Sequence, residues 1–155
     1  MRLLVLFAAS AAWLASADDP AGFVQWKSSE LKSFERKLAP KMNEHKVAAD
    51  TLAKFGNHSV MVAHREGDGQ AELHQTQADV FFVQSGEATL VVGGTVVDPK
   101  DSVPNEILGA SIKDGVRKRL GAGDMVHIPA KTAHQLLVEP GKQFTYAIIK
   151  VDSAN

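Results

Sequence analysis

The stretch ELHQTQADVFFVQSGE, residues 72–87, places charged side chains directly in front of an apolar run. Glu72, His74 and Asp79 come before VFFV, which has the composition of a buried β-strand. Residues two apart on a strand face the same side, so Glu72 and His74 share one face and Asp79 shares one with Phe81 and Val83. Burying carboxylates is costly unless something compensates their charge. We therefore expect these side chains to serve a site within a β-structure.

Short apolar runs separated by turn residues continue on both sides of this stretch. Residues 85–86, Ser-Gly, are interpreted as a turn, and the polar residues 98–116 as a long excursion without regular structure. Seven or eight short strands at such spacing indicate an all-β sandwich or barrel. The runs that carry this prediction are HSVMVAHRE, EATLVVGG, TVVD, VRKRL, DMVHIPA, HQLLVE and FTYAIIKV.

The N-terminal residues 1–17, MRLLVLFAASAAWLASA, have the pattern of a secretory signal peptide. One basic residue precedes an alanine-rich apolar run that ends in a small-x-small sequence, which predicts cleavage after Ala17 and a secreted or periplasmic protein. The mature chain then has no further run long enough to cross a membrane. The formal net charge of −1 argues against nucleic acid as a partner. The absence of cysteine leaves His, Asp and Glu as the available metal ligands.

A helix is predicted at the start of the mature chain. In SSELKSFERKLAP, residues 28–40, Leu31, Phe34 and Leu38 fall at helical spacing. Ser28 or Ser29 is expected to cap the start and a proline to close the end. Residues 41–57 are interpreted as a second short helix or as an irregular segment that leads into the first strand. We thus divide the chain into a signal peptide (1–17), a helical segment (18–57) and a barrel (58–151).

Polar residues also interrupt an apolar strand pattern in a second stretch, residues 121–139, GAGDMVHIPAKTAHQLLVE. Here His134 follows a proline-containing turn and precedes an apolar strand. His134 can therefore converge with Glu72, His74 and Asp79 inside a small barrel. Two histidines and two carboxylates form a ligand set suited to a divalent transition metal.

These residues carry a resemblance to the cupins, small double-stranded β-helix barrels of the jelly-roll type. The first cupin motif, G-x5-H-x-H-x(3,4)-E-x6-G, is similar to the stretch that ends at Gly86, with Asp79 at the glutamate position, His74 at the second histidine and Glu72 at the first. The second motif, G-x5-P-x-G-x2-H-x3-N, is matched by Gly123, Pro129 and His134, while Lys131 and Val138 replace its glycine and asparagine. The resemblance covers residues 58–150.

The resemblance implies one metal ion, often iron, manganese, nickel or zinc, held by His74, Asp79 and His134 with Glu72 as a further candidate. Each residue has an alternative role. Glu72 is a fourth ligand, a general base or a solvated strand-end residue, and Asp79 is a ligand or a turn cap. His134 and His74 are ligands or core histidines.

The positions of His64 and His127 relative to the barrel interior are also predicted. His127 is expected to face away from the barrel interior and to be structural, because Val126 and Ile128 share the opposite face. His64 is expected at the pocket rim or on a solvated edge.

Two classes of function follow. One is a metal-dependent enzyme, an oxygenase or an isomerase, acting on a small sugar or organic acid. The other is a non-catalytic module that binds a small molecule in the barrel. The fold hosts many chemistries and does not decide between these classes. A homodimer is compatible with the resemblance.

Overall fold

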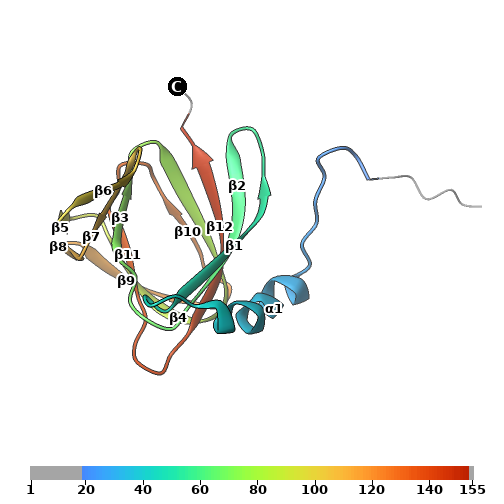
Figure 1. Ribbon diagram of the computed structural model, residues 1–155, viewed down its shortest axis with the longest axis horizontal. Helices are drawn as coiled ribbons and strands as arrows, with labels where there is room; N and C mark the ends of the chain where they lie inside the picture. Colours follow the sequence, from blue (N-terminus) through green and yellow to red (C-terminus); the bar gives the residue numbers. More distant parts are fainter. Residues whose placement is uncertain (1–18, 154–155) are drawn as a thin grey trace, which may run out of the picture.

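The computed structural model describes residues 19–153, and the predicted signal peptide lies outside them. One α-helix and one 3₁₀ turn precede a predominantly β architecture (Figure 1). The elements are α1 (Ser28–Leu38), η1 (Ala39–Lys41), β1 (Val47–Lys54), β2 (His58–Arg65), β3 (Ala71–His74), β4 (Gln77–Val92), β5 (Thr95–Val97), β6 (Lys100–Val103), β7 (Glu106–Gly109), β8 (Ser111–Lys113), β9 (Val116–Gly121), β10 (Met125–Ile128), β11 (His134–Leu137) and β12 (Phe144–Asp152).

Ten of the strands form one curled sheet around an interior (Figure 1). Its main path runs β1-β2-β12-β4-β11-β3-β7-β6, with β9 and β10 also paired to β4, while β5 and β8 form a separate ribbon. The last strand, β12, lies between β2 and β4 and is antiparallel to both. This curled antiparallel sheet confirms the all-β barrel with a preceding helix that the sequence predicts.

The long strand β4 belongs to both walls of the barrel. Its first half pairs with β12 and β10, and its second half, from Glu87 on, pairs with β9 and β11. Gly86 stands at the change of partners with φ of +77°, and a Cβ atom there would collide with the carbonyl group of Gln143. The turn predicted at residues 85–86 is therefore wrong, because this glycine bends a continuous strand instead of ending it.

The excursion predicted at residues 98–116 contains three short strands, β6, β7 and β8. Left-handed residues supply the turns: Asp98, Asn105 and Asp114 all have positive φ. Asp and Asn tolerate this conformation better than other non-glycine residues, which is why so polar a stretch still forms hairpins. The strand β7 pairs with β3 and so covers the edge of the strand that carries Glu72 and His74.

The described part of the predicted helical segment 18–57, residues 19–57, differs from that prediction. Within it only α1 and η1 are helical, and β1 forms a strand paired with β2 over most of its length. The sequence VAADTLAK has no strong strand propensity, so pairing with β2 and partial burial on both faces decide its conformation. Ala48 and Leu52 pack toward α1, while Val47 and Ala49 line the barrel interior.

The helix α1 packs against the outside of the sheet beside β1 and β2 (Figure 1). Phe34 and Leu38 are buried against Val62 of β2, as the helical spacing of the apolar residues predicts. Ser85 of β4 donates a 2.7 Å hydrogen bond to the carboxylate of Glu35. The predicted serine cap is wrong: Lys27 occupies the N-cap position and makes no side-chain capping bond.

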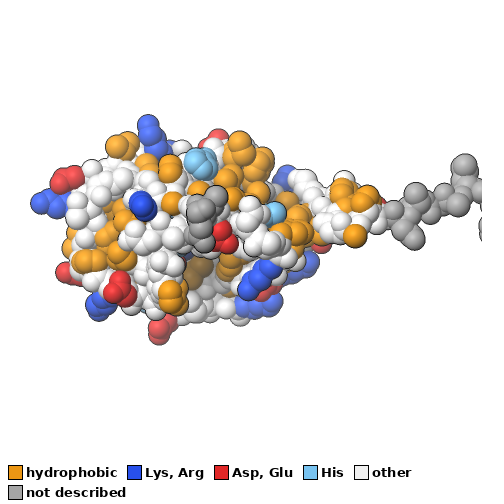
Figure 2. Space-filling view, turned by 90° about the horizontal axis from the view of Figure 1, so that it is seen from above, with side chains coloured by type: hydrophobic (Ala, Val, Ile, Leu, Met, Phe, Trp, Pro, Cys, Tyr) orange, Lys and Arg blue, Asp and Glu red, His pale blue; other side chains and the backbone are white. Residues whose placement is uncertain are grey.

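The main core fills the closed part of the barrel. Its buried residues are Ala63, Phe81, Val83, Ala88, Leu90, Leu120, Ile128, Leu136, Val138, Phe144, Tyr146 and Ile148. The face seen in Figure 2 mixes basic, acidic and hydrophobic side chains. Within residues 19–153, no helix is both long and apolar enough to cross a membrane.

Candidate metal site

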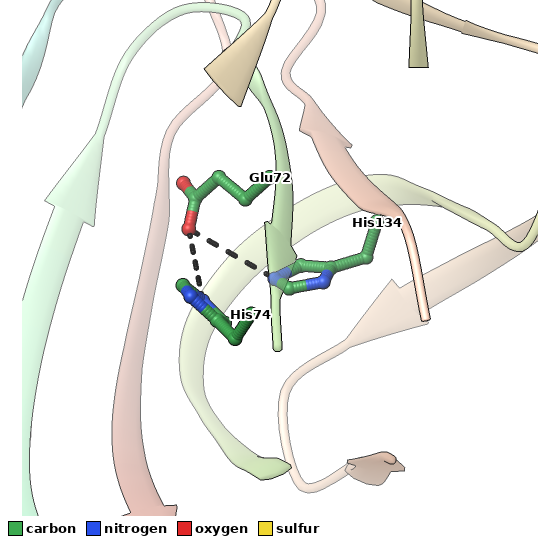
Figure 3. Close-up of side chains that lie close together, drawn as sticks. All are labelled: Glu72, His74 and His134. Carbon is green, nitrogen blue, oxygen red and sulfur yellow. Dashed lines mark ion pairs between the residues drawn. The ribbon is translucent and has the colours of Figure 1, made fainter. Parts of the chain in front are cut away.

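Three of the residues singled out in the sequence meet in the barrel interior (Figure 3). Glu72 and His74 project from β3, and His134 projects from β11, whose register places it opposite Glu72. The Oε2 atom of Glu72 lies 3.6 Å from Nε2 of His74 and 3.9 Å from Nε2 of His134. One potential ligand atom from each residue lies within 4.8 Å of the other two.

Asp79 joins this group from β4. Its side chain is 2% exposed, and Oδ2 lies 3.4 Å from Nε2 of His74 and 3.5 Å from Nε2 of His134. The four predicted site residues therefore surround one small volume. Asp79 shares its buried face of β4 with Phe81 and Val83, as the two-residue periodicity predicts.

Outer contacts orient both imidazole rings. Nδ1 of His134 donates a 3.2 Å hydrogen bond to the carbonyl oxygen of Thr132, and Nδ1 of His74 lies 3.4 Å from the carboxylate of Glu106 on β7. A proton on Nδ1 leaves the lone pair of Nε2 free, which is the arrangement of metal-binding histidines. Nε2 of His134 is buried without a hydrogen-bond partner.

Lys150 is a site residue that sequence reasoning missed. It lies on β12, and its Nζ atom is 2.9 Å from Nε2 of His74 and 3.2 Å from each carboxylate oxygen of Asp79. The signal in the sequence was a lone lysine in the apolar run FTYAIIKV, two and four residues after Ile148 and Tyr146, which line the same interior. An ammonium group has no lone pair, so it donates to Nε2 of His74, and the two residues together hold one positive charge.

A cavity of about 150 Å³ adjoins this group of residues. Arg65 and Tyr146 line it, and Nε of Arg65 donates a 3.0 Å hydrogen bond to the hydroxyl of Tyr146. Nη2 of Arg65 also lies 3.6 Å from Oε1 of Glu72. The cavity therefore has a buried guanidinium group beside the predicted ligands, another feature that the motif comparison did not reveal.

The surrounding charges shift the pKa values of the site. Burial raises the pKa of Asp79, but contacts with His134 and His74 and the charge of Lys150 outweigh it and hold that pKa well below its usual range. Burial also raises the pKa of Glu72, and the contacts with His74 and His134 reverse the effect, so its pKa is lowered. Both carboxylates are therefore ionised at neutral pH, as metal ligands must be.

The pKa of His74 reflects opposing influences. Burial lowers it, whereas contacts with Asp79 and Glu72 raise it to about 9. The 2.9 Å contact with Nζ of Lys150 leaves room for a single proton between the two nitrogens. An ammonium group can donate to Nε2 only when that nitrogen carries its lone pair, so we pair a charged Lys150 with a neutral His74 whose proton is on Nδ1.

The other two histidines lie outside this site. His127 is exposed on β10, with Ile128 buried on the opposite face, as predicted. His64 is neither at the pocket rim nor on a solvated edge, because its side chain is fully buried. Its Nδ1 atom lies 2.8 Å from the hydroxyl of Thr145, and Nε2 lies 3.3 Å from the carboxylate of Glu66. Both ring nitrogens of His64 therefore have a polar partner, and we interpret His64 as a structural residue.

Glu72, His74 and His134 could hold a divalent metal, and Asp79 contacts both imidazoles. Zinc-ligand bonds of about 2.1 Å in a tetrahedron separate the ligand atoms by about 3.4 Å. The observed separations between imidazole nitrogens and carboxylate oxygens run from 3.4 to 3.9 Å. The unpartnered Nε2 of His134 is the further sign, since buried polar atoms ordinarily have partners. Among the surrounding residues, Lys150 disfavours a bound cation most directly, because its positively charged Nζ atom contacts ligand atoms of both His74 and Asp79.

Comparison by sequence identifies no relative. No protein-family profile matches the chain, and no curated protein matches it.

Comparison by structure does find similar proteins. TT1209 from Thermus thermophilus is 15% identical with a TM-score of 0.54, over 77% of this chain and 94% of that one. An uncharacterised conserved protein with a double-stranded β-helix domain from Klebsiella pneumoniae is 17% identical with a TM-score of 0.53, over 72% of this chain and 81% of that one.

The DMSP lyase DddQ from Ruegeria pomeroyi is 17% identical with a TM-score of 0.49, over 68% of this chain. The chain spans 47% of the length of that lyase. At these identities the likeness establishes the fold and nothing of the activity. The chain has a cupin-like double-stranded β-helix fold, which confirms the resemblance at the level of the fold.

Proposed function

We propose that this protein binds one divalent transition metal ion, iron, manganese, nickel or zinc, inside the barrel. Glu72, His74 and His134 would hold it, with Asp79 as a further ligand. The observation that carries the proposal is the buried Nε2 atom of His134, which has no hydrogen-bond partner and faces two carboxylates and a second imidazole. Two imidazoles with carboxylates are ligands of zinc and of non-haem iron.

The substrate or ligand is a small organic molecule bound in the adjoining cavity. Its volume of about 150 Å³ lies below the roughly 300–1,000 Å³ of drug-sized sites, which favours a small organic acid or sugar. Arg65 favours the acid, because a guanidinium group binds carboxylates in two parallel hydrogen bonds. The Tyr146 hydroxyl accepts a hydrogen bond from Nε of Arg65, and Nη2 lies 3.6 Å from Oε1 of Glu72, so a bound acid would share the guanidinium group with Glu72.

The reaction class we propose is an oxygenation, in which molecular oxygen is the oxidant, or an isomerisation. A bound divalent metal acts as a Lewis acid toward substrate oxygens. Arg65 orients the acid group, the apolar residues around the cavity exclude water, and Glu72 acts either as a ligand or as a base toward a proton within hydrogen-bond reach.

A second candidate is a binding module without catalysis. The contact between Lys150 and Asp79 favours it, because it neutralises a buried carboxylate without any metal. Such a module would hold a small acid on Arg65 inside a rigid barrel. Binding of small acids by metal-free protein, without turnover in any metal form, would distinguish this module from the enzyme.

Metal analysis of the protein purified without added metal tests the first proposal. We expect about one divalent ion per chain. His74→Ala and His134→Ala should each lose it, whereas His127→Ala, which removes an exposed imidazole, should retain it. Equal metal content in all four proteins would contradict the assignment.

We also propose export, on the strength of the pattern in residues 1–17. The intact mass of the protein recovered from its native compartment should correspond to a chain that starts at Asp18. A soluble native form that retains Met1 would contradict export.

A further inference from the structure

Lys150 lines the cavity together with Glu72, Asp79 and His134. Its side chain is 21% exposed, whereas the side chains of Asp79 and His74 that it contacts are 2% and 5% exposed. The Nζ atom makes three polar contacts of 2.9–3.2 Å with these two residues. It therefore contacts the same Nε2 and carboxylate atoms that a metal would use.

The charges that face the candidate ligand atoms balance without a metal. Glu72 and Asp79 contribute two negative charges, and Arg65 and the pair of Lys150 with His74 contribute two positive ones. Glu106, 3.4 Å from Nδ1 of His74, adds one further negative charge on the outer side of that ring. Each carboxylate has a cationic partner, Arg65 at 3.6 Å and Lys150 at 3.2 Å. A divalent ion added to this set would leave an excess of positive charge in a buried site, where repulsion between cations is strong.

We propose that Lys150 is a built-in competitor of the metal, and that the metal binds only when the ammonium group leaves Asp79 and His74. This inference rests on the proposed metal site and adds a residue that sets its affinity. The same ammonium group keeps the buried Asp79 compensated while the site is metal-free.

The structure offers a place for the displaced side chain. Asp152 follows Lys150 by two residues on β12 and so lies on the same face, toward the end of the strand. Its Oδ1 atom accepts a 2.7 Å hydrogen bond from Nε2 of Gln77, which leaves Oδ2 available. Rotation of the long lysine stem toward this exposed carboxylate would release Asp79 and His74.

The test compares metal affinities of variants freed of metal by chelator and dialysis. Isothermal titration with Zn²⁺ should show that Lys150→Leu, which cannot ligate a metal, binds one ion at least about tenfold more tightly than the wild type. Lys150→Arg, which retains the charge, should bind no more tightly than the wild type. Lys142→Leu is the matched control, because Lys142 makes a surface ion pair with Glu87, and its affinity should be unchanged.

A second readout covers the stability of the metal-free protein. Removing Lys150 leaves Asp79 without its cation, so Lys150→Leu should melt at a lower temperature than the wild type, and Zn²⁺ should raise its melting temperature by more than it raises that of the wild type. If Lys150→Leu does not fold, Lys150→Gln takes its place in both measurements. Glutamine also removes the positive charge, and its side-chain amide can still donate a hydrogen bond to Asp79.

The outcomes separate this inference from the proposed function. If Lys150→Leu and Lys150→Gln bind Zn²⁺ no more tightly than the wild type, Lys150 does not compete with the metal, and the proposed metal site is unaffected. Binding by the variants but not by the wild type would support the competition and overturn metal binding as the native function. Absence of binding in every protein would overturn both.

Discussion

Lys150 and Asp79 stand directly opposite each other on β12 and β4, and their side chains form an ion pair of 3.2 Å inside the barrel. Cross-strand neighbours are the closest side chains in an antiparallel sheet, so this register alone brings the two charges together. One partner is almost fully buried and the other reaches in from the more exposed end of the site. The pair therefore links the stability of the metal-free protein to the protonation of Asp79.

The first prediction is that the metal-free protein loses stability in acid through Asp79. Its pKa in the folded state is lowered, so the stability it contributes is complete above its unfolded pKa of about 3.9 and is lost as the pH falls below that value. Asp79→Asn should be less stable at pH 7 by roughly 3 kcal/mol, because Lys150 loses its buried partner. Its stability should also fall less between pH 5 and pH 3.

Urea denaturation at pH 7, 5, 4 and 3 measures both effects. Asp50→Asn serves as the control, because Asp50 makes only an exposed ion pair with Lys41. That variant should follow the wild-type curve closely. An Asp79→Asn curve parallel to the wild type at all four values would show that Asp79 does not contribute to the acid dependence.

The second prediction concerns Glu72, whose Oε2 atom faces both imidazoles. We expect Glu72→Gln to weaken Zn²⁺ binding by at least about tenfold, because the neutral amide is a poor ligand and leaves less negative charge around the ion. Titration of the metal-free variant measures this change. An affinity equal to that of the wild type would favour the role of general base, in which case turnover of any substrate found should drop about 10²-fold or more.

The third prediction concerns the docking of α1. Leu38 is fully buried against the outer face of the sheet. Leu38→Ala should lower the free energy of unfolding by about 2–5 kcal/mol through lost burial and a residual cavity. Lys32→Ala, on the exposed side of the same helix, should change it by less than about 0.5 kcal/mol. Metal stoichiometry should be the same in both variants, since the helix lies outside the barrel.

The fourth prediction concerns Lys131, which stands where the second cupin motif has glycine. Its φ is +63°, in the left-handed region that glycine adopts without strain. Lys131→Gly should therefore raise the free energy of unfolding by up to about 1 kcal/mol, and Lys131→Ala should not. Thermal denaturation compares the two, and a glycine variant less stable than the alanine variant would contradict the expected strain.

The sequence predicted those parts of the site that depend on short-range spacing. The two-residue periodicity placed Glu72 and His74 on one face, and the motif spacing identified His134. Lys150 and Arg65 were missed because they reach the site only through pairings between distant strands, such as Lys150 opposite Asp79. No local pattern specifies which residue of β12 lies beside which residue of β4.

The errors in the fold have the same origin. The strand β1 has a helix-tolerant sequence, and its pairing with β2 decides its conformation. The strands at 98–116 are short and mostly polar, and the left-handed Asp and Asn residues that turn them are weak signals. In Ser85-Gly86 the glycine signalled a change of direction correctly, but the structure uses it for a bend within a strand.

The insertion of β12 between β2 and β4 has a consequence for the order in which the protein forms during synthesis. Hydrogen bonds between side chains on β12 and on β2 or β4 span 71 to 81 residues, and β12 comes after all the other strands of residues 19–153. The gap between β2 and β4 stays open until β12 has left the ribosome, so the barrel cannot close before that strand is made. Pairings between segments so far apart in sequence also form slowly. The nascent chain therefore remains open for longer than a protein built from local hairpins.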